Sequence, residues 1–189
     1  MDSSSYLYQH LLGPGWDQLA EAVRRAHSCG DVIHAQASGR VLRGQTLLAR
    51  TLAHVLRMPH ESDNSRISLT ITRVRQVELW NRSFDGTCLV TTQTGGPERS
   101  LIERWGPLEF RFRLETRDGA LYYHQLACRF SIGRVRIPLP AWASPWVSAR
   151  EGPATSSNRS TVSVSVMAPL LGPILNYEAE VEIRSPIAL

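Results

Sequence analysis

Three ionisable side chains stand at apolar positions of segments in which apolar and polar residues alternate. These residues are Arg82, Glu103 and His124. Their apolar neighbours two positions away are, in the same order, Trp80 and Phe84, Leu101 and Trp105, and Tyr122 and Leu126. Successive side chains of a β-strand point to opposite faces, so we predict that all three point into the apolar interior of a sheet. A buried charge is costly unless it is paired, and we therefore expect Arg82 and Glu103 to contact each other.

Two interpretations of these residues are open at this point. In the first, Glu103 or His124 donates or accepts a proton, and Arg82 polarises a carbonyl group or holds a carboxylate of a substrate. In the second, Arg82 and Glu103 form a structural ion pair, and His124 is a hydrogen-bonded histidine of the core. The substitution Glu103→Gln separates them, because a large loss of stability without an effect on a ligand favours the structural role.

Other kinds of chemistry find little support in the sequence. All 21 basic residues are arginines, so no lysine is present to form a Schiff base. No histidine pair has a metal-site spacing such as HxxxH, and no GxSxG, P-loop or GxGxxG motif occurs. We therefore expect no metal ion, no cofactor and no ordinary hydrolase. The net charge of +4 is spread singly along strands and interleaved with glutamates, which argues against nucleic-acid binding.

Two-residue alternation runs through most of the chain between residues 66 and 184. It predicts antiparallel strands, each with one apolar and one polar face. The expected strands span about residues 66–74, 76–84, 87–94, 99–105, 108–117, 120–133, 147–151, 159–168 and 174–184. Turn residues such as Asp85-Gly86 and Asp118-Gly119 fall between consecutive strands. About nine to ten strands exceed what an open sheet tolerates, so we expect an antiparallel β-barrel or a strongly curved half-barrel.

Residues 1–60 predict a helix, a strand and a second helix. Residues 6–27 have helical periodicity interrupted by Gly13-Pro14-Gly15, residues 31–42 alternate as a strand, and residues 45–57 form the second helix. We expect these two N-terminal helices to cap a mainly β (α+β) barrel, and residues 1–189 to form a single domain. The segment 134–148 contains three prolines and two tryptophans, and we expect it to be a long loop that covers the barrel.

Several short motifs give the chain a family resemblance. They are Trp80-Asn81-Arg82-Ser83-Phe84, Leu101-Ile102-Glu103-Arg104-Trp105-Gly106-Pro107, Ile137-Pro138-Leu139-Pro140, Leu11-Leu12-Gly13 and Val41-Leu42-Arg43-Gly44. With these motifs, nearly the whole chain resembles the bacterial domain of unknown function 4166. The resemblance implies one domain, which in that family occurs alone or fused to proteins like saccharopine dehydrogenase, and it implies no particular reaction.

The predicted barrel interior favours two functions of different classes. The first is a hydrophobic small-molecule-binding barrel, extending to a cofactor-free cyclase, isomerase or lyase for a polyketide-, terpenoid- or lipid-like substrate. Its expected lining consists of Trp80, Phe84, Phe110, Phe112, Tyr122, Trp142 and Trp146. The second is a non-catalytic protein-interaction domain with a fully packed core. Whether the chain is an enzyme stays open, and the volume of the cavity discriminates between the two functions.

The sequence also bears on location. The chain has no apolar segment of the roughly 20 residues that a membrane-spanning helix needs. Its first sixteen residues lack the basic and apolar regions of a signal peptide. We therefore expect a cytoplasmic protein that does not span a membrane.

Overall fold

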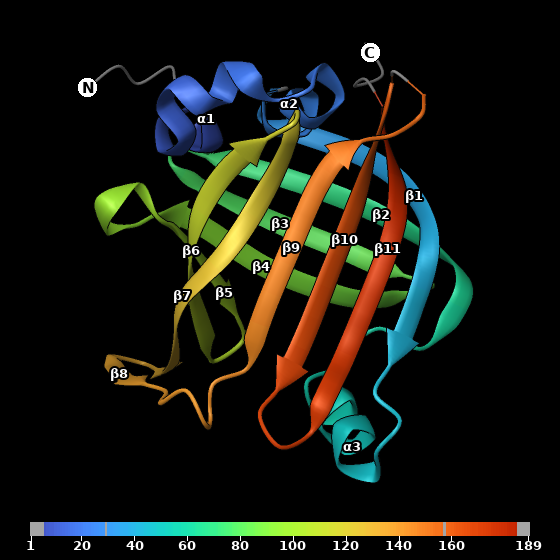
Figure 1. The fold of residues 1–189 in the computed structure, drawn as a ribbon, viewed down its shortest axis with the longest axis vertical. Helices are drawn as coiled ribbons and strands as arrows, with labels where there is room; N and C mark the ends of the chain where they lie inside the picture. Colours follow the sequence, from blue (N-terminus) through green and yellow to red (C-terminus); the bar gives the residue numbers. More distant parts are fainter. Residues whose placement is uncertain (1–5, 29, 157, 185–189) are drawn as a thin grey trace.

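The structure, a computed structural model, describes residues 6–28, 30–156 and 158–184. These residues form a closed antiparallel β-barrel of ten strands, with one further strand outside it (Figure 1). The strands are β1 (Val32–Arg43), β2 (Ser62–Val74), β3 (Val77–Phe84), β4 (Thr87–Gly95), β5 (Leu101–Trp105), β6 (Leu108–Arg117), β7 (Ala120–Ile132), β8 (Val135–Pro138), β9 (Trp146–Pro153), β10 (Arg159–Ala168) and β11 (Gly172–Arg184). Their order is β6-β5-β4-β3-β2-β1-β11-β10-β9-β7, and β6 pairs with β7 to close the barrel. The predicted antiparallel barrel is confirmed.

Tight turns join the strands of the two best-predicted hairpins. Asp85 and Gly86 connect β3 to β4 with φ angles of 47° and 91°. Asp118 and Gly119 connect β6 to β7 with φ angles of 52° and 74°. Positive φ at both turn residues matches the right-handed twist of the flanking strands, which is why Asp-Gly marks such hairpins. These turns fix the register that carries the apolar positions of β3 and β6 to the inner face.

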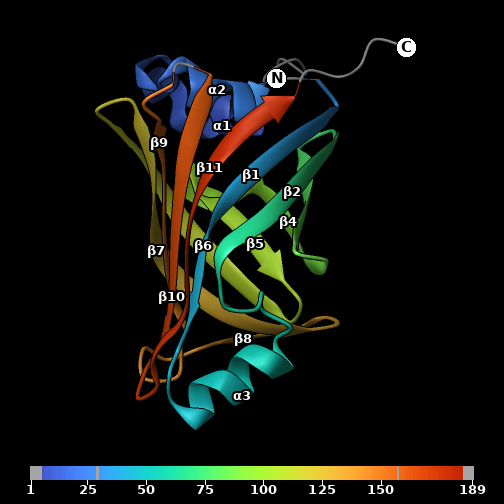
Figure 2. The ribbon, with the colours of Figure 1, turned by 90° about the vertical axis from the view of Figure 1, so that its right-hand side faces the viewer.

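Helices occupy both ends of the barrel (Figures 1 and 2). The helix α1 (Leu7–Leu12), the 3-10 helix η1 (Gly13–Gln18) and the helix α2 (Glu21–Ser28) lie across one end, which we call the capped end. The helix α3 (Leu47–Val55) lies at the other end, which we call the α3 end. The predicted N-terminal helices are therefore present, one group at each end. In the described ranges, no helix has the length and apolar composition needed to cross a membrane.

The apolar core is divided between these two ends. Beneath α1 and α2, the buried residues of the helices follow helical spacing, as in Leu7 and Leu11, and pack against Trp80, Phe112 and Tyr123 of the barrel. At the α3 end, a second cluster joins Ala49 and Ala53 of α3 to residues of the barrel and its loops, among them Met58, Phe84, Val166 and Leu175. The interior of the barrel, the lumen, therefore runs between a helical cap at one end and a single short helix at the other.

Part of the predicted covering loop is a strand. Residues 135–138 form β8, which pairs with residues 129–132 of β7 beyond the closed part of the barrel. All four residues of β8 are exposed. The prediction of a continuous loop over 134–148 is wrong here, because the turn at Gly133 has a φ of 58° and reverses the chain into a short hairpin.

Candidate functional site

A cavity of about 150 Å³ lies in the lumen. Four of the predicted lining residues, Trp80, Phe84, Phe110 and Phe112, line it, and so do the predicted polar residues Arg82 and Glu103. Their side chains reach the lumen because they occupy alternate positions of β3, β5 and β6. Most of the other lining residues are apolar, and β10 contributes Val162, Val164 and Val166.

Several inward-facing apolar side chains are only half-buried. Leu89, Ala149, Val162 and Val164 line the cavity and each retains intermediate exposure. In a fully packed barrel, side chains at these positions would be covered by the facing strands. The middle of the lumen is therefore not filled by the protein's own side chains.

Arg82 and Glu103 face each other inside the lumen, as predicted. The Nη2 atom of Arg82 lies 3.7 Å from Oε1 of Glu103, and the two side chains are 15% and 18% exposed. Nη1 of Arg82 donates to the hydroxyl of Thr91 at 2.9 Å, and the guanidinium lies 4.7 Å from the centre of the Trp80 ring. Burial alone would lower the pKa of Arg82, but the nearby Tyr177 and Glu103 more than offset it and raise that pKa. Arg82 is therefore a permanently charged group in an apolar space.

The carboxylate of Glu103 has unused hydrogen-bonding capacity. Its contact with Arg82 is longer than a hydrogen bond, and no described residue donates a hydrogen bond to it. A carboxylate oxygen in a tight arginine pair would accept one or two N–H donors at less than 3 Å. Glu103 and part of the Arg82 guanidinium are consequently available to a polar group of a bound molecule.

His124 and Tyr122 lie outside the lumen, contrary to prediction. Gln125 pairs with Phe112 of β6, while Ala127 pairs with Arg111, so Leu126 has no partner across the strand. Such a β-bulge inserts one residue and reverses which positions face inward on one side of it. The side chain of His124 is 43% exposed and its Nε2 lies 3.0 Å from Oε2 of Glu115. On this side of the bulge Tyr123, rather than Tyr122, lines the cavity.

The two predicted tryptophans of the covering segment also lie outside the lumen. Trp142 is 73% exposed and borders a second cavity of about 310 Å³ at the α3 end, together with Leu52 and Leu56 at α3. Trp146 begins β9, is exposed and borders neither of the two cavities. Of this pair, only Trp142 is near a space that a ligand could occupy.

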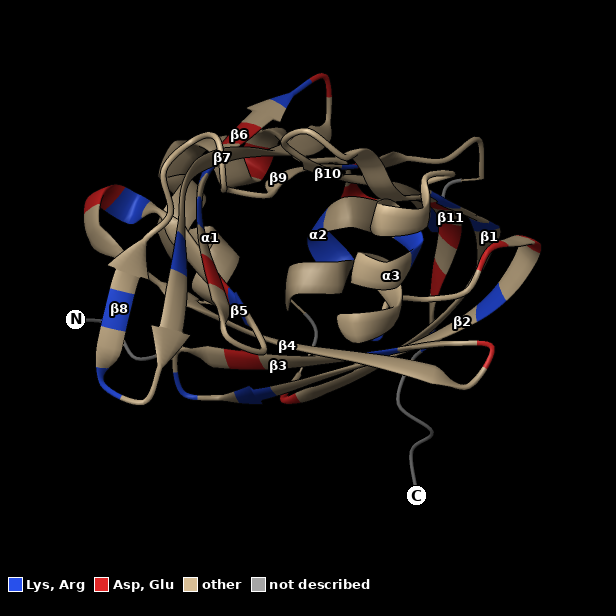
Figure 3. Cartoon of the chain, turned by 90° about the horizontal axis from the view of Figure 1, so that it is seen from below, with Lys and Arg blue, Asp and Glu red and all other residues tan. Residues whose placement is uncertain are grey.

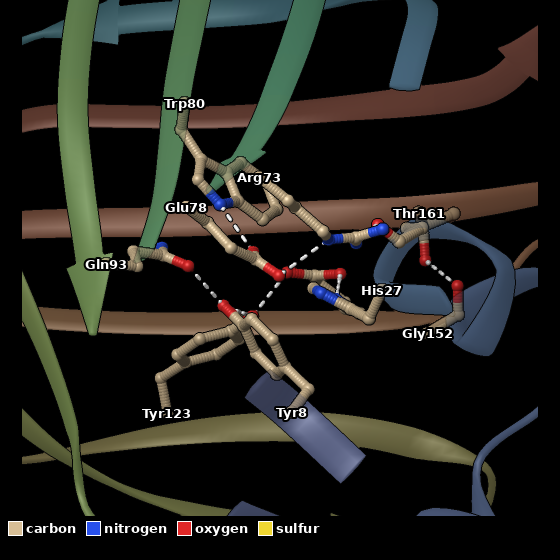
Figure 4. A network of polar contacts seen from close by, with 11 residues as sticks. Tyr8, His27, Arg73, Glu78, Trp80, Gln93, Tyr123, Gly152 and Thr161 are labelled. Carbon is tan, nitrogen blue, oxygen red and sulfur yellow. Dashed lines mark hydrogen bonds and ion pairs between the residues drawn. The ribbon is translucent and has the colours of Figure 1, made fainter. Parts of the chain in front are cut away.

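The sequence did not reveal a second polar group, which lies where the lumen meets the capped end (Figure 4). Tyr123 donates to Oε1 of Glu151 at 2.6 Å and lies 3.2 Å from the hydroxyl of Tyr8, which donates to Gln93 at 2.6 Å. Nε2 of His27 lies 2.9 Å from Oε2 of Glu151. The network therefore joins α1 and α2 to β4, β7 and β9.

The protonation states in this network follow from its burial. Burial and the charge of Glu151 raise the pKa of Tyr8 and of Tyr123 well above the ordinary value, so both hydroxyls keep their protons. Burial also opposes the charge on Glu151, but His27 and the hydrogen bond from Tyr123 outweigh it and lower the pKa of that carboxyl. Glu151 is therefore an ionised carboxylate. Of the residues in this network, Tyr123 and Glu151 line the cavity and give it a polar edge.

A buried ion pair accompanies this network. Nε of Arg73 donates to Glu78 at 2.8 Å, and the indole N–H of Trp80 donates to the other carboxylate oxygen at 3.0 Å. Arg73 also donates to the backbone carbonyls of Ala26 and Gly30. This pair thus fastens α2 to the hairpin formed by β2 and β3.

Some of these residues left a signal in the sequence. Glu78 extends the inward-facing series of Trp80, Arg82 and Phe84 by two positions, and Glu151 is two positions beyond Ala149. His27 follows Val23 by four residues, which places both on the same face of α2. No pattern in the sequence indicates that the helix carrying His27 lies above the strand carrying Glu151.

The lumen is polar toward one end and apolar toward the other. Glu78, Gln93 and Glu151 lie near the capped end, while Arg82 and Glu103 lie further along. The lining that packs with the α3 cluster is apolar and includes Met58, Phe84, Leu89, Val166 and Leu175. Polarity therefore decreases from the capped end to the α3 end.

Comparison with known proteins places this geometry in a family without assigning it a role. No curated protein and no solved structure matches the chain. Residues 19–181 match the family described as a domain of unknown function (DUF4166), and this range includes every barrel strand except the last residues of β11. The chain belongs to the DUF4166 family.

Proposed function

We propose that the barrel binds an apolar small molecule in its lumen. The observation that carries this proposal is the cavity of about 150 Å³, bordered by apolar side chains that the protein itself leaves half-buried. A cavity of roughly this volume in another protein stays dry and binds benzene. The adjoining cavity of about 310 Å³ at the α3 end adds room for a longer molecule, in keeping with a polyketide-, terpenoid- or lipid-like ligand.

Arg82 and Glu103 are the polar anchors of this ligand. Each has capacity for another hydrogen bond, and in an apolar space an unpaired polar group gains most from a partner. The guanidinium suits a carbonyl, carboxylate or phenolate oxygen of the ligand, and the carboxylate suits a hydroxyl group. The alternative, a packed interaction domain, is disfavoured by the volume of the lumen.

The first test is to fill the lumen. Native mass spectrometry of freshly purified protein is expected to detect a co-purified apolar compound. Val164→Trp places an indole in the cavity and is expected to lower the bound fraction at least about tenfold, because the ligand and the indole compete for the same space. Ser163→Trp, one residue earlier on the outer face of β10, is the matched control and is expected to retain the compound.

The outcomes of this test are distinct. Retention of the compound by Val164→Trp, or equal loss from both variants, contradicts binding in the lumen. Failure to detect any compound is followed by titration with a panel of apolar compounds and measurement of thermal stability. No shift with any member of the panel contradicts the proposal.

We further propose that Glu103 transfers a proton to or from the bound molecule. A carboxylate base that faces an arginine can remove a proton from a carbon next to a carbonyl, while the guanidinium stabilises the enolate oxygen that results. Return of the proton to another carbon isomerises the substrate, and no redox partner is needed. Arg82 and Glu103 face the lumen and carry this chemistry. His124 points outward and takes no part in it.

Proton transfer to carbon is measurable as isotope exchange. In D₂O, the wild-type protein is expected to incorporate deuterium into the co-purified compound, as followed by mass spectrometry. Glu103→Gln is expected to abolish this exchange while the compound stays bound, because the amide is not a base. The free energy of unfolding should change by only about 1 kcal/mol, since the contact with Arg82 is longer than a hydrogen bond and the amide oxygen of glutamine can still accept from the guanidinium. Absence of exchange in the wild type, or a large destabilisation of the variant without a change in exchange, contradicts the catalytic role.

A further inference from the structure

The α3 end of the barrel exposes apolar side chains to solvent. In α3, Ala49 and Ala53 face the barrel, whereas Leu47, Leu48 and Val55 are exposed, with Leu47 at 82%. A helix packed on a barrel normally keeps its large apolar residues on the buried face. Here Ala49 and Ala53 are buried and Leu52 is half-buried, whereas the other large apolar residues of α3 are exposed.

The neighbouring segments at this end share the same character. The hairpin of β7 and β8 exposes Ile132, Val135 and Ile137, and the following segment exposes Trp142. The turn between β10 and β11 exposes Leu170 at 97%. Figures 1 and 2 place this hairpin, this turn and α3 at the same end of the barrel.

This distribution is concentrated rather than scattered. Ten of the sixteen large apolar side chains that are exposed in the described residues belong to α3, to the segment from Ile132 to Trp146, or to the end of β10 and the turn that follows it, residues 167–170. Single exposed apolar residues are normal on a protein surface, but a group of them at one end marks an interaction surface.

The three apolar segments at this end carry basic side chains, and the carboxylates Glu61 and Asp63 follow directly after the first of these segments. The segments 43–60, 132–147 and 166–173 contain five arginines and no aspartate or glutamate. Four of the five, Arg50, Arg57, Arg134 and Arg136, are exposed and form no ion pair with any residue that the structure describes. Figure 3, which views this end, shows the basic positions on β8 across the end of the barrel from α3. The surface is therefore both apolar and cationic.

A second cavity adjoins the lumen at the same end. The cavity of about 310 Å³ lies between Leu52 and Leu56 near α3, Trp142, and Leu171 of the β10–β11 turn. It shares Met58, Trp105, Phe110 and Val166 with the lining of the lumen cavity, so the two spaces adjoin. The capped end is covered by α1, η1 and α2.

We propose that the α3 end docks on a membrane surface containing anionic lipids, and that the apolar ligand of the lumen enters from the bilayer. Exposed leucine, isoleucine and tryptophan side chains insert at the boundary between headgroups and acyl chains, and arginines attract anionic headgroups. A protein partner would have to be acidic and apolar, but a membrane also explains why the cavity opens on this surface. The proposed docking is argued from the exposed apolar side chains and arginines of the α3 end alone, whereas entry of the ligand from the bilayer rests on the proposed function of the lumen.

Vesicle flotation tests the docking without any knowledge of the ligand. The full chain is mixed with vesicles of phosphatidylcholine alone or of equal parts phosphatidylcholine and phosphatidylglycerol. It is expected to float with the anionic vesicles and much less with the neutral ones, and added salt should weaken the binding. Arg134→Gln combined with Arg136→Gln is expected to reduce the preference for anionic vesicles several-fold.

Two double variants with the same change of charge separate docking from general electrostatics. Leu47→Glu with Leu170→Glu alters two exposed residues of the α3 end and is expected to weaken binding to anionic vesicles at least about tenfold. Glutamate at the first residue of α3 is compatible with the helix, so the fold should persist. Val74→Glu with Val90→Glu changes exposed residues of β2 and β4 away from this end and is expected to bind much like the wild type.

Each outcome decides the matter. Equal weakening by both double variants, or no flotation of the wild type, overturns docking through the α3 end. A wild type that forms a concentration-dependent dimer through Leu47 and Leu170 and does not float also overturns it in favour of a second copy. Failure of docking while native mass spectrometry still detects a lumen compound leaves the proposed function standing. Flotation of Val164→Trp without a bound compound supports docking independently of the ligand.

Discussion

Glu78→Ala is expected to lower the free energy of unfolding by about 3–5 kcal/mol, because it removes one partner of a buried ion pair. The side chains of Arg73 and Glu78 are 7% and 2% exposed, so water compensates little for the lost carboxylate. The indole N–H of Trp80 loses its acceptor in the same substitution. Arg73 would keep its bonds to the carbonyls of Ala26 and Gly30 and lose its contact with the carboxylate of Glu78. Chemical denaturation followed by tryptophan fluorescence measures the effect.

Asp63→Ala provides the control for this prediction. Asp63 also pairs with an arginine, Arg40, at 2.9 Å, but the two side chains are 88% and 61% exposed. Exposed pairs contribute little, so a far smaller change is expected. Similar destabilisation by both substitutions would mean that the site around Glu78 is hydrated in solution. The difference in destabilisation between the two variants therefore indicates how far water is excluded from the ion pair at the capped end.

Glu151→Gln is expected to destabilise the protein at neutral pH. The free energy of unfolding of this variant should also decrease less than that of the wild type as the pH is lowered. The lowered pKa of Glu151 means that its ionised form is favoured in the folded state. Its contribution is present above the ordinary carboxyl pKa of 4.5 and is lost as the pH falls through the lower value of the folded protein. At pH 7 the variant should lose on the order of 1–3 kcal/mol, the usual range for a charged hydrogen-bonded group.

Denaturation curves collected between neutral pH and pH 3 test the sign as well as the size. The difference in stability between wild type and Glu151→Gln should be largest at neutral pH and shrink below pH 4.5. Other carboxylates with lowered pKa values, such as Glu21 and Asp85, titrate in both proteins and cancel in the difference. A difference that stays constant with pH would show that Glu151 gains nothing from its contacts with His27 and Tyr123.

The strands were predictable because the barrel has one dry and one wet face. Alternation in β3 placed Trp80, Arg82 and Phe84 on the inner face, and the same rule in β5 placed Glu103 there. The cost of burying a charge then predicted that Arg82 and Glu103 lie together, as they do at 3.7 Å. These inferences needed only the period of a strand and the energetics of a buried charge.

The errors at Tyr122 and His124 arose where a single residue breaks the period. Leu126 is an apolar residue in an apolar series, and nothing in its type marks it as the unpaired residue of a bulge. The bulge nevertheless exchanges Tyr122 for Tyr123 and removes His124 from the lumen. The contact between His27 and Glu151, 124 residues apart in sequence, depends on how α2 settles on the closed barrel. Periodicity predicts the faces of elements, but not the contacts between distant ones.

The decrease in polarity along the lumen has a consequence for any guest with one hydrophilic terminus. Its charged or hydroxylated head matches Arg82 and Glu103, while its hydrocarbon tail matches Met58, Leu89 and Val166 beside α3. Because α1 and α2 cover the capped end, such an amphiphile would have to enter the lumen from the α3 end with its polar head first. Its hydrocarbon tail would then lie toward the α3 end. The barrel would then select ligands by their polar head group and accept hydrocarbon tails of different lengths.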